Sequence, residues 1–156
     1  MKKFAYSICL AGVLALPGVL HARPVTLTTQ LQNYSGDGAY LAIYVTDAAG
    51  KYQKTLWVAG KKTKYYKNLR DWARGSGMRA SEFDGVSGAS VGSGKTLKVT
   101  VELADALIDA GYEIRIDTAV EDQRDNPGEL RVPLSTANKA KPTAGRGYVK
   151  AFSFDM

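Results

Sequence analysis

The chain has 156 residues, a formal net charge of +6 and 45% hydrophobic residues, which is enough apolar material for one domain with one core. Its single cysteine, Cys9, and its single histidine, His21, both lie before residue 23. If that segment is removed, as the next pattern predicts, the remainder has neither side chain. Disulfides, c-type haem attachment, thiolate or imidazole metal sites, and Ser-His or Cys-His catalysis are then excluded.

The first residues have the pattern of a cleavable signal peptide. Lys2 and Lys3 precede an apolar stretch over 4–20, and Leu20-His21-Ala22 provides a small-residue cleavage site. The apolar stretch is too short and too interrupted by glycine and proline for a membrane-spanning helix, which needs about 20 apolar residues. We therefore expect residues 1–22 to be a signal, and 23–156 to be one periplasmic domain that is not embedded in the membrane. The formal charge of that domain is +4, because Lys2 and Lys3 leave with the signal.

Most of the domain alternates between apolar and polar residues with period two, which is typical of strands buried on one face. The runs lie at 25–31, 41–45, 97–103, 112–116, 130–134 and 148–154, and glycine-, asparagine- or proline-containing turns separate them. The polar positions expected to face solvent include Lys98, Thr100, Glu102, Glu113, Arg115 and Asp117. The pattern predicts a mostly β fold, an immunoglobulin-like antiparallel β-sandwich.

One segment, 63–74, breaks this pattern and predicts a short helix. Tyr65, Leu69 and Trp72 recur at spacings of four and three residues, with Thr63 as the expected cap and Gly75 as the expected stop. Positive charge is concentrated in and around this helix, at Lys61, Lys62, Lys64, Lys67, Arg70, Arg74 and Arg79. Such a patch could bind an acidic partner, phosphate groups or an anionic surface, or it could simply be solvated. Nucleic acid is not an expected partner outside the cytoplasm.

The glycine- and serine-rich loop over 83–94 contains two overlapping motifs. Residues 89–96, Ala-Ser-Val-Gly-Ser-Gly-Lys-Thr, fit a relaxed P-loop, but that motif needs a helix after it, and Thr96 begins an alternating strand. The P-loop interpretation is therefore rejected. The second motif, over 84–90, is Asp-Gly-Val-Ser-Gly-Ala-Ser, and five specified positions of this kind should match by chance about once in a thousand such chains.

This second motif resembles the acceptor sequence Asp-x-x-Ser/Thr-Gly-Ala-Thr/Ser of flavinylated extracytoplasmic proteins. In those proteins an FAD:protein FMN transferase joins FMN through its phosphate to the last hydroxyl, which would be that of Ser90. The resemblance implies that Gly88 and Ala89 leave room for the transferase, that Asp84 positions the loop or a metal in the transferase, and that Ser87 belongs to the same motif. The structural alternative for all five is an ordinary turn, in which Gly88 supplies a positive φ.

A wider pattern resembles a predicted periplasmic family of unknown function whose genes often lie near flavin transferases and PepSY-type membrane proteins. The positions that carry it are Trp57-x-x-Gly60, Tyr65-x-x-x-Leu69-x-x-Trp72, the motif over 84–90 and Gly111-Tyr112. The resemblance implies a β-sandwich engaged in flavin-based electron transfer. The chain departs from flavinylated relatives in having serine at position 90, where threonine is commoner, and in lacking the Thr-Ser that often follows.

Two function hypotheses result. The first is a periplasmic electron carrier, rather than a substrate-turning enzyme, with FMN bound covalently at Ser90 and with Trp57 and Trp72 stacking on the flavin or, alternatively, packing in the core. The second is a non-redox binding or assembly module that docks partners through its basic helix. A hydrolase is not supported, because no nucleophile–base pair is visible, and we expect no catalytic residues and no metal.

Overall fold

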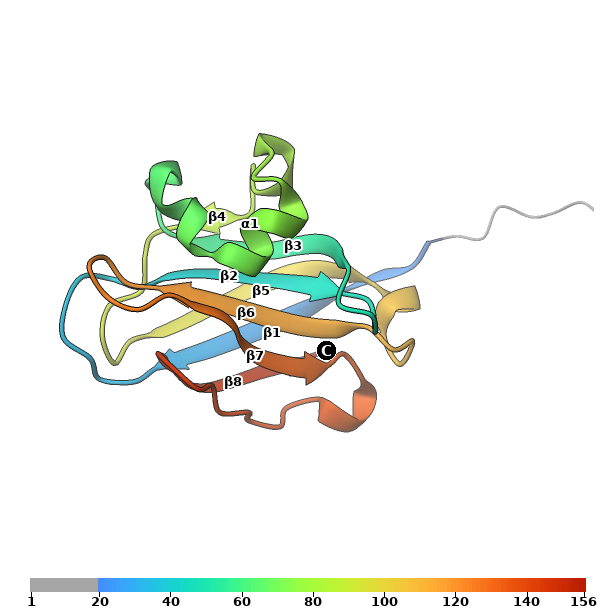
Figure 1. Ribbon diagram of the computed structural model, residues 1–156. Coiled ribbons are helices and arrows are strands. Elements are labelled where there is room, and N and C mark those ends of the chain that lie inside the picture. The colour runs from blue at the N-terminus through green and yellow to red at the C-terminus, as the bar shows by residue number, and fades with distance from the viewer. Residues whose placement is uncertain (1–19) are drawn as a thin grey trace, which may run out of the picture.

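The computed structural model describes residues 20–156, which form two β-sheets packed face to face (Figure 1). The first sheet has the order β5-β1-β8, with β1 at Ala22–Leu31, β5 at Thr96–Ala104 and β8 at Val149–Asp155. The second has the order β4-β3-β2-β6-β7, with β2 at Tyr40–Thr46, β3 at Tyr52–Ala59, β4 at Ser87–Gly88, β6 at Glu113–Ala119 and β7 at Asn126–Pro133. All pairs are antiparallel except β3 with β4. The expected mostly β sandwich is confirmed.

The space between the sheets holds the main core, and the period-two pattern accounts for it. Alternate residues of five strands are fully or almost fully buried there, including Val25, Leu27, Leu31, Leu41, Ile43, Val45, Ile114, Ile116, Leu130, Val132, Phe152 and Phe154. On β5 the predicted solvent-facing residues Lys98, Thr100 and Glu102 are exposed. Burial of each large apolar side chain contributes about 1.5–3 kcal/mol, so this core is the main source of stability.

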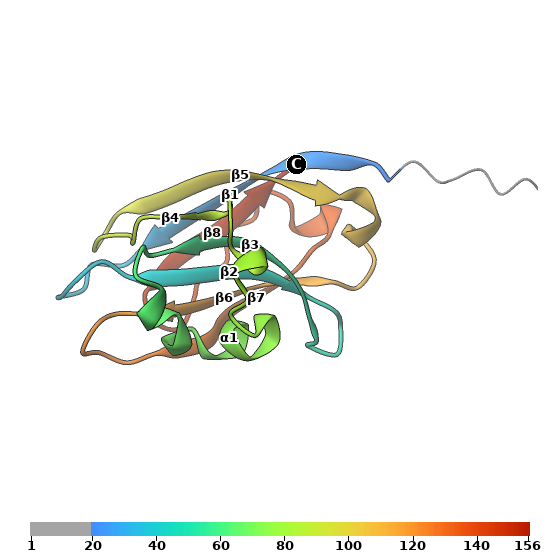
Figure 2. The same cartoon turned by 90° about the horizontal axis from the view of Figure 1, so that it is seen from above.

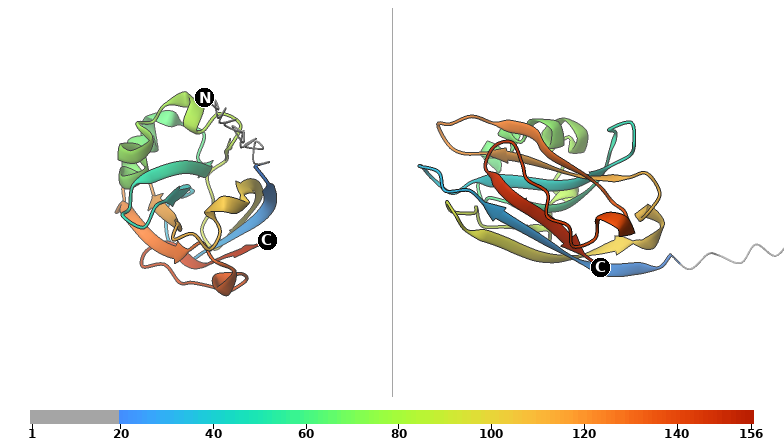
Figure 3. Two further views of the ribbon diagram at one scale, coloured as in Figure 1. Left: turned by 90° about the vertical axis from the view of Figure 1, so that its right-hand side faces the viewer. Right: turned by 90° about the horizontal axis from the view of Figure 1, so that it is seen from below.

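A second, smaller core lies on the outer face of the five-stranded sheet, beneath two consecutive short helices (Figures 1 and 3). The helices are η1 at Thr63–Asn68 and α1 at Arg70–Ser76. The apolar side chains that they enclose are Ala42, Tyr44, Val58, Tyr66, Leu69, Trp72 and Ala119. The domain therefore has three layers at this point, and β2 and β3 are buried on both faces.

The predicted single helix over 63–74 is a 3₁₀ segment followed by an α-helix, with a break at Leu69, whose φ and ψ are −84° and 72°. Tyr66, Leu69 and Trp72 follow one another at intervals of three and are all buried. A 3₁₀ turn has three residues per turn, which keeps such positions on one face. The second core thus selects the tighter helix for the first half of the segment.

The helix ends also differ from the prediction. Lys62, not Thr63, precedes the first turn, and the C-terminal residue in the left-handed region is Gly77, with φ of 64°. Gly75 lies inside α1, where a Cβ would come within 2.5 Å of the Tyr52 Cβ. The glycine that was expected to stop the helix instead lets it approach β3 closely.

A carboxylate that was expected to face solvent, Asp117 on β6, is completely buried, and the prediction is wrong on this point. Its two oxygens accept hydrogen bonds from the Trp72 N–H at 2.8 Å, the Gly128 N–H at 2.7 Å and the Tyr44 hydroxyl at 2.9 Å. Burial raises the pKa of Asp117, although these three hydrogen bonds act in the opposite direction. Helix α1 begins after Leu69 without a side-chain cap, and Trp72 is its third residue, so Asp117 supplies the missing cap from the sheet.

The predicted signal peptide falls mostly outside the described residues, which begin at 20. Ala22, the last residue of that prediction, is also the first residue of β1 and pairs with Ala104. Within residues 20–156, no helix has the length and apolar character needed to cross a bilayer. Three further 3₁₀ turns complete the chain: η2 at Ala80–Glu82, η3 at Asp105–Leu107 and η4 at Thr136–Asn138.

Candidate functional site

The first half of the Asp84–Ser90 motif is fixed to the edge of the five-stranded sheet. Its central residues, Ser87 and Gly88, form β4, which runs parallel to β3 on the side of the sandwich where β5 also lies (Figure 2). The Val58 N–H donates to the Val86 carbonyl at 2.9 Å, and the Gly60 N–H donates to the Gly88 carbonyl at 2.8 Å. The sequence predicted a loop here, whereas the backbone is a short edge strand.

The motif ends next to a second backbone anchor. Val91 and Ala39 exchange hydrogen bonds in both directions, at 2.7 and 2.9 Å. Ala89 and Ser90 are therefore a two-residue span between fixed points, and both are exposed. The Ser90 side chain lies against Gly38, where a Cβ would come within 2.6 Å of the Ser90 Oγ. Ser90 is thus an exposed residue, and no hydrogen bond within residues 20–156 uses its Oγ.

Trp57 on β3 lies directly beside the motif. A Cβ on Gly88 would come within 2.8 Å of the Trp57 Cζ2, so the ring packs against the Gly88 backbone, and glycine is needed there for close contact rather than for a positive φ. The indole is partly buried against the main core, and its Nε1 is a buried donor without a partner in the described part of the chain. Trp57 is thus an aromatic side chain that borders the motif.

Trp72, the other tryptophan expected at the site, is 0% exposed and belongs to the second core. Its ring packs edge-on against Tyr66, and its Nε1 donates to the Thr55 Oγ1 at 2.9 Å. A ligand at the surface has no face of this ring to stack on. The structure therefore brings together Trp57, Asp84, Ser87, Gly88, Ala89 and Ser90, and leaves Trp72 apart from them.

The segment that leads into the motif is held by a network of hydrogen bonds that was not predicted from the sequence. The Tyr52 hydroxyl donates to the Glu82 Oε2 at 2.5 Å and lies 2.6 Å from the Thr55 Oγ1. Since the Tyr52 proton is committed to Glu82, Thr55 must donate to Tyr52, and Trp72 in turn donates to Thr55. This hydrogen-bond network connects the second core to Glu82 in η2, which lies two residues before Asp84.

The pKa values in this network follow its geometry. The hydrogen bond from Tyr52, and then that from Arg79, lower the pKa of Glu82. Burial, followed by the hydrogen bond to Glu82, raises the pKa of Tyr52 to about 12. Glu82 is therefore a carboxylate and Tyr52 a neutral phenol at neutral pH, which is the protonation state that the network requires.

The chemistry open to the motif depends on whether a base lies next to the Ser90 hydroxyl. A serine hydroxyl is a weak nucleophile until a neighbouring base removes its proton, and within residues 20–156 no side chain is hydrogen-bonded to the Ser90 Oγ. Asp84 is exposed at the start of the motif, and its own N–H donates to the Ala80 carbonyl. Across the described residues no cluster of three or more His, Cys, Asp or Glu side chains could hold a metal ion.

Positive charge lies beside the motif. Lys61 and Lys62 follow Gly60, the residue bonded to Gly88, and both are exposed. The Tyr65 ring lies 5.9 Å from the Lys62 Nζ and 4.8 Å from the Lys64 Nζ, and its hydroxyl donates to Glu121 at 2.7 Å. None of the four lysines at 61, 62, 64 and 67 has an ion-pair partner among the described residues. The part of the expected basic patch that is exposed without an ion pair is therefore the four lysines in and just before η1, since Arg70, Arg74 and Arg79 each form an ion pair.

These features define a mostly β sandwich domain that presents an exposed serine without a hydrogen bond on a fixed edge segment next to a basic surface. The chain belongs to the family described as "Predicted periplasmic protein (DUF2271)", which matches residues 22–151. That description supports the expected periplasmic location, while the cleavable signal remains a prediction. No curated protein and no solved structure is similar enough to the chain to match it.

Proposed function

We propose that this protein is a periplasmic electron carrier that holds FMN through a phosphoester on the Ser90 hydroxyl. The observation that carries the proposal is the position of Ser90, which ends an Asp-x-x-Ser-Gly-Ala-Ser motif, is an exposed residue between two backbone anchors, and has a hydroxyl without a hydrogen bond of its own. A buried or committed hydroxyl would have argued against modification by another enzyme.

The attachment reaction balances with FAD as the co-reactant and an FAD:protein FMN transferase as the catalyst. The Ser90 oxygen forms a bond to the FMN phosphorus, the bond from that phosphorus to the bridging oxygen of the FAD pyrophosphate breaks, and AMP departs with the electron pair. The serine proton passes to a base of the transferase, because the Ser90 surroundings contain no base bonded to it.

The residues around the motif fit a bound flavin nucleotide. Gly88 and Ala89 add almost no side-chain bulk next to the acceptor, and Lys61 and Lys62 bring positive charge to the same end of β3, which would offset a phosphodiester charge. Trp57 is a partly buried aromatic residue whose ring packs against Gly88, next to the acceptor. When bound, FMN supplies reversible one- and two-electron transfer, and the protein holds and presents it.

The partners of such a carrier would be redox proteins at the membrane, and a PepSY-type membrane protein is the candidate that the family resemblance suggests. The basic surface on η1 would contact an acidic region of that partner, since its lysines are free of internal ion pairs in the described chain.

Co-expression with an FAD:protein FMN transferase, followed by intact-mass measurement, tests the proposal. We expect a mass gain of one FMN less one water in the wild type and in Ser81→Ala, whose serine is equally exposed but lies outside the motif. Ser90→Ala should show no gain. An unmodified wild type, or a gain that persists in Ser90→Ala, would contradict the assignment.

The uncompensated lysines also favour a second candidate, a non-redox module that docks an acidic partner through η1. Protein that stays colourless after co-expression and binds an acidic partner with an affinity that falls steeply with salt would support this function instead.

A further inference from the structure

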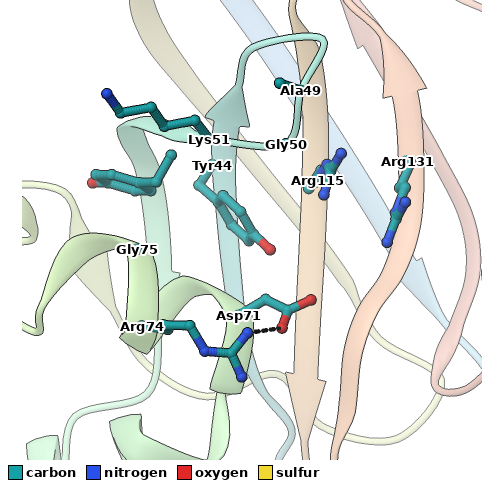
Figure 4. Close-up of a pocket in the computed structure, with 10 residues that line it drawn as sticks. Tyr44, Ala49, Gly50, Lys51, Asp71, Arg74, Gly75, Arg115 and Arg131 are labelled. Carbon is teal, nitrogen blue, oxygen red and sulfur yellow. Dashed lines mark ion pairs between the residues drawn. The ribbon is translucent and has the colours of Figure 1, made fainter.

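A cleft of about 460 Å³ lies on the outer face of the five-stranded sheet, far from Ser90 (Figure 4). One wall is helix α1, another is the turn between β2 and β3, and the floor is formed by β6 and β7. Tyr52, at the start of β3, lines the cleft, whereas Ala59, at the end of β3, pairs with Gly88 of the motif. The eight-residue strand separates the two sites by about 25 Å.

Positive side chains from three elements line this cleft. Arg74 comes from α1, Arg115 from β6 and Arg131 from β7, with Lys51 on the rim, and Asp71 is the one acidic residue among the lining side chains. Arg115 and Arg131 are direct cross-strand partners. Like charges in this position repel one another and destabilise a sheet unless a counter-charge lies between them.

The existing counter-charges satisfy only part of this cluster. Arg115 is 12% exposed and donates from Nε and Nη2 to the Glu113 Oε2, at 3.0 and 2.8 Å, so its guanidinium is held rigidly. Gly50 closes over it, because a Cβ there would come within 3.2 Å of the Arg115 Nη2. Asp71 pairs with Arg74 at 3.5 Å. Arg131 has no ion pair within residues 20–156.

We propose that this cleft binds a phosphate group, either as inorganic phosphate or as the phosphate of a small monoester. Arg115 and Arg131 come from two adjacent strands and Arg74 from the helix that walls the cleft, so an anion in it can be contacted from more than one side, which suits a tetrahedral dianion better than the two coplanar oxygens of a carboxylate. The volume of the cleft is in the range of small-ligand sites and leaves room for an organic substituent. This site is independent of the flavin proposal, since it shares no residue with the motif.

Two charge-changing variants should shift the affinity for phosphate in opposite directions. Arg131→Gln removes the unpaired guanidinium and should weaken phosphate binding about tenfold, the scale of one lost hydrogen bond to a charged group. Asp71→Asn removes the carboxylate that competes for Arg74 and should tighten binding about threefold. Arg124→Gln, on the exposed turn between β6 and β7, is the matched control and should bind like wild type.

The test is an NMR titration of the full ¹⁵N-labelled chain, purified after export, with inorganic phosphate, glycerol 3-phosphate and succinate at constant ionic strength, against chloride. Saturable amide shifts confined to residues 49–51, 71–75, 115 and 131, with both phosphates binding more tightly than succinate, support the site. Whichever of inorganic phosphate and glycerol 3-phosphate binds more tightly shows whether the natural ligand is free phosphate or a phosphate monoester. Shifts equal to those in chloride, succinate binding as strong as phosphate, or unchanged affinity in both Arg131→Gln and Asp71→Asn would overturn it. Using both variants keeps the test decisive if one fails to fold.

Discussion

Asp117→Asn is the substitution for which the structure gives the most detailed expectation. The Asp117 Oδ1 accepts from Tyr44 and Gly128, and its Oδ2 accepts from the Trp72 N–H. An asparagine can keep its oxygen on the Oδ1 side and satisfy the first two donors. Its amide N–H₂ then faces the Trp72 N–H, so two donors meet and helix α1 loses the hydrogen bond that caps its first turn.

The magnitude follows from this count. Losing one hydrogen bond to a charged acceptor, with a buried N–H left unpaired, costs about 1.5–3 kcal/mol, and the cheaper burial of a neutral amide offsets a small part of it. We therefore expect a loss of about 2 kcal/mol in the free energy of unfolding and a Tm lower by about 6 °C. Asp117→Ala leaves three donors unpaired and should cost roughly twice as much.

Urea unfolding followed by tryptophan fluorescence would measure this loss, because Trp72 is buried under the helix that Asp117 caps. Amide hydrogen exchange should show the extra opening confined to residues 70–76. Glu102→Gln, which removes a carboxylate from the exposed face of β5, is the control and should change stability by less than about 0.5 kcal/mol. If Asp117→Asn were as stable as wild type and α1 exchanged no faster, Asp117 would not be acting as the cap.

Three further expectations concern the motif and its support. Gly38→Ala places a Cβ within 2.6 Å of the Ser90 Oγ and should slow FMN attachment several-fold, measured by intact mass as the labelled fraction after a fixed co-expression time. The control is Gly92→Ala, whose Cβ meets nothing nearer than 3.5 Å and which should be labelled like wild type. Equal labelling of the two variants would count against the Ser90 geometry. Gly88→Ala forces the Trp57 ring aside at 2.8 Å and should destabilise the domain by about 1–3 kcal/mol with a red-shifted tryptophan emission, whereas an unshifted spectrum would show that the ring does not pack there. Because the pKa of Glu82 is lowered in the folded state, its contribution to stability is complete above the unfolded pKa of about 4.3 and disappears as the pH falls through the folded pKa. The free energy of unfolding of Glu82→Gln should therefore be smaller than that of wild type at pH 7 and approach it in acid. A difference that does not depend on pH would refute the Tyr52–Glu82 interaction.

The strands that face solvent on one side could be predicted from the sequence. Not every strand that is covered on both sides could be predicted. β1 alternates from Val25 onward, β5 alternates along its length, and β8 does so from Phe152 onward, as one-sided burial requires. β3 contains the run Leu56-Trp57-Val58, in which Leu56 and Trp57 both pack against the main core at a register shift with β2, whereas Val58 meets the helices. Period two is then lost, and the strand was not predicted. The burial of Asp117 has the same cause, since only the tertiary position of α1 covers it.

The motif at 84–90 could be located from the sequence because its seven positions are contiguous. Its surroundings depend on partners far along the chain, such as Ala39 and Gly38 next to Val91 and Ser90, and on Tyr52 next to Glu82. Residue spacing gives no information on such pairs. The expected proximity of Trp72 failed for a related reason, because a tryptophan near a motif in sequence can point to the opposite side of a sheet.

Although β4 is only two residues long, it covers part of the rim of β3, an eight-residue strand rich in apolar and β-branched residues. An enzyme that displaced β4 to reach the serine would leave the Val58 and Gly60 amides of β3 unpaired. The exposed edge of β3 could then pair with a strand of a second molecule. Because Ser90 is exposed between fixed points, an enzyme that modified it as proposed would not need that opening. The anchored segment would then keep the edge of β3 covered during the modification.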